Sequence, residues 1–185
     1  RRARPGEILA ITFTNKAAAE MRERVEALVG PAAQRMWVST FHSACVRILR
    51  REAATLGLRS SFSIYDAADS QRLLTLVARE LGLDPKKYPV RAMAAKISHL
   101  KDELVDAERF ATTSGAGSND FDAVLADVYT RYTARLRQAN ALDFDDLIAE
   151  TVHLLHAFPA VAEHYHRRFR HVLVDEYQDT NHAQY

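Results

Sequence analysis

The sequence has little of what several protein classes require. It holds a single cysteine, Cys45, among 185 residues, which excludes an internal disulfide framework and a multi-cysteine zinc site and fits a reducing, cytoplasmic compartment. No stretch approaches the roughly 20 apolar residues of a membrane helix, so we expect no membrane partner. The 25 Lys and Arg residues against 24 Asp and Glu leave a net charge of +1, which argues against a polycationic nucleic-acid coat but permits a local basic groove.

Two further absences concern the start of the chain and its glycines. The chain opens Arg1-Arg2-Ala3-Arg4, without Met and without a signal peptide, so we expect a segment of a longer protein. None of the 6 glycines is followed by Lys, so the sequence lacks the G-x-x-x-x-G-K-[ST] loop that cradles nucleotide phosphates.

Short apolar strands alternate with helical patterns in the first fifty residues. Glu7 to Phe13 and Met36 to Ser39 are typical of buried strands. Thr14-Asn15 and Thr40 supply helix-capping side chains directly after them. This β-α-β-α order predicts an α/β fold with a parallel sheet and covering helices.

Helical patterns then dominate as far as residue 139. Apart from a short strand-like stretch at 62–65 and a small, polar loop at 111–119, the apolar residues recur at helical spacing. The α/β pattern returns when Asp143 begins a helix. We therefore expect residues 1–56 and 140–185 to form one α/β domain, interrupted by an all-helical inserted subdomain at 57–139.

The strongest local signal is V-L-V-D-E, Val172 to Glu176. A buried parallel strand that ends in two acids places both carboxylates at the carboxyl edge of a sheet, where α/β proteins bind ligands. The competing interpretation is a strand followed by a solvated acidic turn. The longer string D-E-Y-Q-D-T-N, Asp175 to Asn181, favours a functional site.

Four strings in order resemble a known family. They are I-T-F-T-N-K-A-A-A-E-M-R-E-R-V (11–25), S-T-F-H-S-A-C-V-R-I-L-R (39–50), N-A-L-D-F-D-D-L-I (140–148) and V-D-E-Y-Q-D-T-N (174–181). Together they are similar to motifs of the UvrD/PcrA/Rep family of superfamily 1 DNA helicases, nearest to its UvrD/PcrA branch. The resemblance implies a partial RecA-like motor domain, with the missing phosphate loop lying upstream of Arg1.

The resemblance also implies functional residues. Asp175 would bind Mg2+ and, with Glu176, ATP, while Glu176 would be the catalytic base for water attack. Phe13, Thr14 and Asn15 match one segment that lines the path of single-stranded DNA, and the matches in the next such segment are Thr40, Phe41 and His42. Phe13 could instead be the last core residue of its strand.

Three acids of the third string, Asp143, Asp145 and Asp146, we interpret as capping and coupling residues rather than metal ligands. His164, His166 and His171 lie among arginines without a recognisable ligand spacing, and a solvated basic face explains them better.

The resemblance implies an ATP-dependent helicase that moves 3′ to 5′ on single-stranded DNA and meets duplex–single-strand junctions, in DNA repair and replication. Repair proteins would be its partners, near the bacterial nucleoid. We expect this segment to be inactive alone and able to self-associate through an exposed sheet edge. The alternatives are the motor of a RecB/AddA-type helicase–nuclease and a degenerate helicase-like module that only binds DNA.

Overall fold

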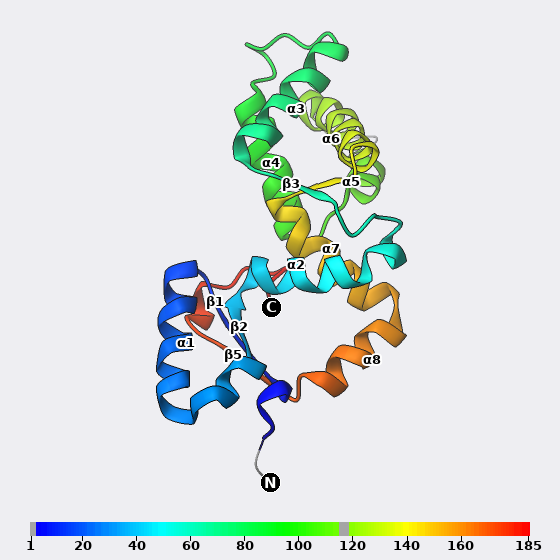
Figure 1. Ribbon diagram of the computed structural model, residues 1–185. Helices are drawn as coiled ribbons and strands as arrows, with labels where there is room; N and C mark the ends of the chain where they lie inside the picture. Colours follow the sequence, from blue (N-terminus) through cyan, green and yellow to red (C-terminus); the bar gives the residue numbers. More distant parts are fainter. Residues whose placement is uncertain (1–2, 115–118) are drawn as a thin grey trace.

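The computed structural model describes residues 3–114 and 119–185 of the chain. They form an α/β body and a helical body, with one long helix, α7 (Phe144–Ala157), running between them (Figure 1). The predicted α/β class is therefore confirmed. Each body has its own apolar core, the first around Leu49 and Phe62 and the second around Val77 and Leu125.

A three-stranded parallel sheet organises the α/β body. The strands β1 (Ile8–Thr12), β2 (Trp37–Thr40) and β5 (His171–Val174) lie in the order β2-β1-β5. Side chains of a strand alternate between its two faces. Leu9 and Ile11 accordingly join the core formed with α2 (Phe41–Glu52), α7 and α8 (Pro159–Arg168). Helix α1 (Asn15–Val29) lies on the opposite side of the sheet (Figure 1).

Strand β5 was expected to be buried, and that prediction is wrong. The side chains of Val172 and Leu173 are 54% and 59% exposed. The reason is position: β5 is hydrogen-bonded to β1 on one side only, and within residues 3–114 and 119–185 no strand pairs with its other side. The sheet therefore has an open apolar edge.

The helical body contains α3 (Ala67–Glu80), α4 (Val90–Asp102), α5 (Ala107–Thr113) and α6 (Asp120–Gln138). The predicted apolar stripes of α3, α4 and α6 face its core, except Leu104, which lies beyond α4 and packs against the core of the α/β body. The predicted loop at 111–119 is partly wrong, because Ala111–Thr113 complete α5; residues 115–118 lie outside the described part.

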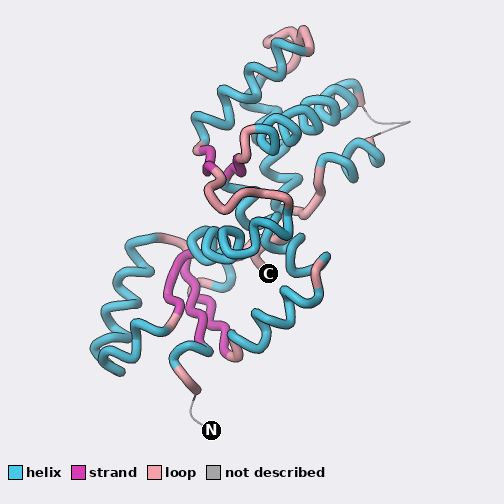
Figure 2. Tube along the Cα trace, turned by 45° about the vertical axis from the view of Figure 1, so that its right-hand side comes forward, coloured by secondary structure: helices cyan, strands magenta, loops and turns pink. Residues whose placement is uncertain are grey.

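The prediction of an all-helical inserted subdomain is wrong in one respect. Strand β3 (Ser63–Tyr65) pairs in parallel with β4 (Ala141–Asp143), so the chain leaves the α/β body and returns to it side by side (Figure 2). The Ser63 amide donates to the Asn140 carbonyl at 3.0 Å. Asn140 has a left-handed backbone with φ 48°, and its side-chain oxygen accepts a hydrogen bond from the Arg59 amide. These contacts hold together the two stretches of chain that link the α/β body to the helical body, and they form one narrow junction.

Candidate nucleotide and DNA site at the sheet edge

The carboxyl ends of the three parallel strands meet at one edge. Thr12 at the end of β1 is the register partner of Thr40 at the end of β2. On the other side, the Asp175 amide donates to the Ile11 carbonyl at 2.9 Å, directly after β5. The order across the edge is thus Thr40, Thr12 and Asp175. Residues far apart in the sequence that we predicted as site residues are brought together here.

Both acids that follow β5 are exposed. Among the described residues, no Lys, Arg or His lies within ion-pair distance of the Asp175 carboxylate. An unpaired, accessible carboxylate at this edge is a suitable hard-oxygen ligand for Mg2+. Glu176 has a left-handed backbone, with φ 50° and ψ 43°, and its carboxylate accepts a hydrogen bond from the Gln178 amide group at 2.5 Å. The chain therefore turns sharply at Glu176, directly after the strand.

The segment after β1 combines an aromatic ring with a helix start. Phe13 is partly exposed, and its ring packs against that of Phe41 with centroids 5.4 Å apart. Thr14 is the N-cap of α1, where its side-chain oxygen accepts a hydrogen bond from the Ala17 amide at 3.1 Å. Asn15 is exposed in the first turn of α1. The predicted capping role of Thr14 is confirmed, and this role occupies one acceptor position of its hydroxyl.

The segment after β2 is more deeply buried. Thr40 is only 6% exposed and Phe41 8% exposed. The Thr40 hydroxyl accepts a hydrogen bond from the Ser43 amide at 3.2 Å and so caps α2, as predicted. His42 is half-buried. Of these three side chains, His42 is therefore the most accessible to a ligand.

Phe144 is a candidate that the sequence reasoning missed. It is the first residue of α7, its side chain is 48% exposed, and its ring meets that of His42 edge-on with centroids 5.9 Å apart. A large aromatic side chain exposed next to a candidate site is a typical stacking surface for a nucleic-acid base. The signal was present in the string L-D-F-D-D, in which we considered only the acids.

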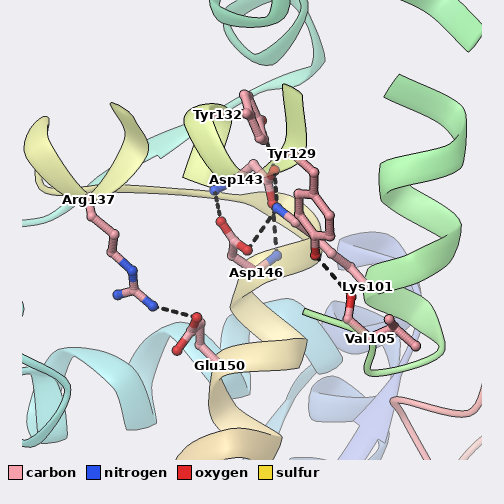
Figure 3. Close-up of polar contacts among 8 residues, drawn as sticks. All are labelled: Lys101, Val105, Tyr129, Tyr132, Arg137, Asp143, Asp146 and Glu150. Carbon is pink, nitrogen blue, oxygen red and sulfur yellow. Dashed lines mark hydrogen bonds and ion pairs between the residues drawn. The ribbon is translucent and has the colours of Figure 1, made fainter. Parts of the chain in front are cut away.

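A buried ion cluster lies at the start of α7, next to Phe144 in the sequence (Figure 3). Lys101 of α4, 4% exposed, contacts the carboxylates of Asp143 at 2.6 Å and Asp146 at 2.8 Å. The Tyr132 hydroxyl donates to Asp143 at 2.8 Å. Asp143 and Asp146 also form the capping box of α7. The predicted capping role of Asp143 is thus confirmed, whereas nothing in the sequence marked Lys101 as their shared partner.

The same cluster shifts the acidity of both carboxyl groups. Burial would raise the pKa of Asp143, but the charge and hydrogen bond of Lys101, together with hydrogen bonds from the Asp146 amide and Tyr132, hold that pKa below its ordinary value. Burial dominates at Asp146 and raises its pKa to about 6, although Lys101 opposes the rise. One buried cation thus contacts two carboxyl groups, and it lowers the pKa of each. Within the described residues, no group of three or more His, Cys, Asp or Glu side chains is arranged to hold a metal ion.

The parallel sheet and its carboxyl edge define the class of the protein. It is an α/β protein with a helical insertion, and it carries a pair of acids at the edge where α/β proteins bind ligands. No helix in the described part of the chain is long and apolar enough to span a membrane. Residues 1–185 match the family described as the UvrD/REP helicase N-terminal domain, so the chain belongs to the UvrD/REP helicase family.

Curated relatives agree with this assignment. The chain is 65% identical over 181 residues to the "ATP-dependent DNA helicase UvrD1" of Mycobacterium tuberculosis, an alignment that covers 97% of this chain and 24% of that protein. It is 49% identical over 181 residues to the "ATP-dependent DNA helicase PcrA" of Bacillus subtilis, covering 98% of this chain and 24% of that protein. The chain thus spans about a quarter of the length of these relatives.

Proposed function

We propose that this chain is the first part of the motor of an ATP-dependent DNA helicase. The observation that carries the proposal is the carboxyl edge of the sheet, where Asp175 and Glu176 lie in one row with the segments 13–15 and 40–42. The names of the relatives, ATP-dependent DNA helicases, support it. A nucleotide at one end of this row and a DNA strand at the other would be bound by adjacent strand ends of a single rigid sheet.

The two acids take different roles in this proposal. The Asp175 carboxylate, exposed and unpaired among the described residues, binds the Mg2+ that accompanies ATP and offsets phosphate charge. The Glu176 carboxylate accepts the proton of the attacking water as general base. Residues 1–56 and 140–185 form the motor part and residues 57–139 the inserted subdomain.

The accessible aromatic rings form the DNA side. Phe13, His42 and Phe144 present ring surface on which bases of any identity can stack. Thr14 and Asn15, at the start of α1, face backbone phosphates, because the amides of a helix N-terminus attract anions. Thr40 and Phe41, which are buried, act by holding His42 and Phe13 in place.

The finer features of the proposal rest on the family resemblance. The helicase moves 3′ to 5′ along single-stranded DNA, acts at duplex–single-strand junctions and works with repair proteins in the cytoplasm, at the nucleoid. The isolated chain has no ATPase activity of its own and binds single-stranded DNA weakly. It self-associates through the open edge of β5, where Val172 and Leu173 are exposed.

Phosphate release by the complete helicase tests the ATPase roles. Glu176→Gln keeps the shape of the side chain but removes the base, so we expect turnover to fall at least about 100-fold. Glu163→Gln is the matched control, because Glu163 is an exposed acid on α8 that pairs with Arg167. Turnover that survives Glu176→Gln unchanged would reject the assignment of the general base.

DNA binding by the isolated chain tests the aromatic path. Phe144→Ala removes an exposed stacking surface, which is worth about 1–3 kcal/mol per base, so affinity for an oligothymidine should fall about fivefold or more. Leu28→Ala, an exposed apolar residue at the far end of α1, is the control. Binding should also weaken as salt rises, because phosphate contacts release counterions. Affinity independent of salt and of Phe144 would contradict the proposed path.

A further inference from the structure

Two adjacent residues at the end of α4 contact two different parts of the proposed site. Lys101 contacts the start of α7, where Asp143 and Asp146 accept its hydrogen bonds. Asp102 contacts the segment that follows the Asp175–Glu176 turn. Helix α4 belongs to the inserted helical body, so this body touches both functional regions through one helix end.

The contact through Lys101 determines where Phe144 lies. Asp143 is the N-cap of α7, and Phe144 is the next residue. The Lys101 ion pair is buried. Moving the N-cap of α7 away from α4 would therefore leave buried charges without a partner, which costs free energy. The position of the Phe144 ring, and of His42 against it, is thereby tied to α4.

The contact through Asp102 involves both its side chain and its backbone. The Asn181 side-chain amide donates to the Asp102 carboxylate at 2.9 Å, and the Ala183 amide donates to the Asp102 carbonyl at 3.0 Å. Asn181 is itself fixed, since its side-chain oxygen accepts a hydrogen bond from the Gln184 amide at 2.9 Å. The end of the D-E-Y-Q-D-T-N segment is thus attached to the inserted body.

Asp102 also lies close enough to His42 to interact with it electrostatically. Burial raises the pKa of the Asp102 carboxyl, and His99, Asn181 and His42 each oppose that rise. The carboxylate that binds Asn181 is thus also within the electrostatic influence of His42, a residue of the proposed DNA path.

We propose that Asp102 is a positioning residue that couples DNA occupancy to ATP turnover, by holding Asn181 at the same helix end whose Lys101 holds the cap next to Phe144. The inference rests on the proposed function. A DNA strand that displaces Phe144 or His42 shifts α7 and the end of α4, and the Asp102–Asn181 hydrogen bond passes this shift to the turn that carries Asp175 and Glu176. Asp102 touches neither substrate in this scheme.

The experiment measures the stimulation of ATPase activity by single-stranded DNA in the complete helicase, as the ratio of kcat with saturating oligothymidine to kcat without it. Asp102→Ala removes the acceptor for Asn181, and Asn181→Asp places two carboxylates face to face. We expect each to lower the ratio about fivefold or more, and Asp102→Ala to keep basal kcat within about twofold of wild type. Asp102→Asn, which retains an acceptor oxygen, should keep the wild-type ratio.

A charge swap isolates the pair itself. Combining Asp102→Asn with Asn181→Asp restores one amide donor facing one carboxylate, so the double variant should regain the stimulation that Asn181→Asp loses. Glu103→Ala, an exposed acid at the same helix end, is the control and should behave as wild type. Thermal unfolding of each variant confirms that folding is retained.

The possible results separate the inference from the proposed function. Unchanged stimulation in Asp102→Ala, an equal fall of basal and stimulated kcat, or a swap that restores nothing would each overturn the coupling role. ATPase activity that persists in Asp175→Asn would instead reject the proposed function, whatever the Asp102 variants do.

Discussion

Lys101 illustrates how strongly burial alters a single side chain. Its ammonium group is enclosed between two carboxylates and lies 5.3 Å from the centre of the Tyr132 ring. Burial alone would lower its pKa, but the attraction of Asp146 and Asp143 outweighs burial and raises the pKa above its ordinary value. The lysine therefore stays charged throughout the pH range in which the protein works, and its removal leaves two acids without a cation.

Replacing Lys101 by Met should destabilise the chain strongly. Because the change leaves buried carboxylates uncompensated, we expect a loss of about 3–5 kcal/mol in the free energy of unfolding. Urea unfolding followed by circular dichroism measures it. Lys96→Met, an exposed lysine of the same helix, is the control. The wild-type contribution should be complete below the unfolded pKa near 10.5 and decrease as pH rises above it. A loss no larger than that of Lys96→Met would contradict the buried cluster.

Cys45 should be protected from thiol reagents in the folded chain. Burial raises the pKa of its thiol to about 11, against an opposing hydrogen bond with Thr151, and the thiolate is the reactive form. We expect a disulfide reagent at pH 8 to react slowly with the native chain and rapidly in urea. The pKa of this thiol in the folded chain exceeds the ordinary value of 9.0. The contribution of the buried neutral thiol to the free energy of unfolding is therefore complete below about pH 9 and is lost as pH rises through 11. Equal labelling rates in both conditions would show that the thiol is accessible.

At the scale of helices and strands, capping side chains were the most informative feature of the sequence. Thr14, Thr40 and Asp143 predicted the starts of α1, α2 and α7 correctly, because each oxygen satisfies an amide that the first helical turn leaves free. The strand that precedes Asp175 was also predicted correctly, and the structure places its end at Val174. These signals are local, and local chemistry can be read from the sequence.

Long-range pairing was harder to predict. Strand β4 has only three residues, and its partner β3 lies more than seventy positions earlier in the sequence. No periodic pattern of apolar residues could therefore identify this pairing. The exposure of β5 depends on which strands lie beside it, and the burial of Lys101 depends on the packing of α4 against α7. The sequence strings located the acids and aromatic residues of the site, but only the register of the sheet shows that they share one edge.

The cap of α3 offers a test at this scale, far from the proposed site. The Asp66 carboxylate accepts a hydrogen bond from the Asp69 amide at 2.8 Å and forms a reciprocal capping box with Asp69. Asp66→Ala should lower the free energy of unfolding, whereas Asp66→Asn should retain most of the cap. The same amide bond lowers the pKa of Asp66, so the benefit is present above the ordinary value of 3.8 and is lost as pH falls below it. Equal stability of the Ala and Asn variants in chemical unfolding at pH 7 would argue against the cap.

For the molecule as a whole, the open side of the sheet is the main feature that departs from an ordinary folded domain. A strand with free amides and carbonyls along one side and apolar side chains on both faces is a template for pairing with another strand. The chain spans about a quarter of the length of its curated relatives.

The isolated chain should therefore associate at high concentration. Two copies related by a twofold axis can pair β5 with β5, and Leu173→Lys should weaken this pairing because it places a charge next to its own counterpart. Light scattering after size-exclusion chromatography measures the mass. Leu76→Lys, an exposed leucine of α3, is the control. A strict monomer at every concentration would refute the pairing.

The narrow junction formed by β3 and β4 has a consequence for how such a protein can change over evolutionary time. Paired strands lie roughly 5 Å apart, so Ser63 and Ala141 are neighbours in space although they are far apart in the sequence. Everything between these points can lengthen, shrink or be exchanged while the path of β1, β2 and β5 stays the same. Any replacement for the helical body would have to reproduce its contacts through Lys101 and Asp102.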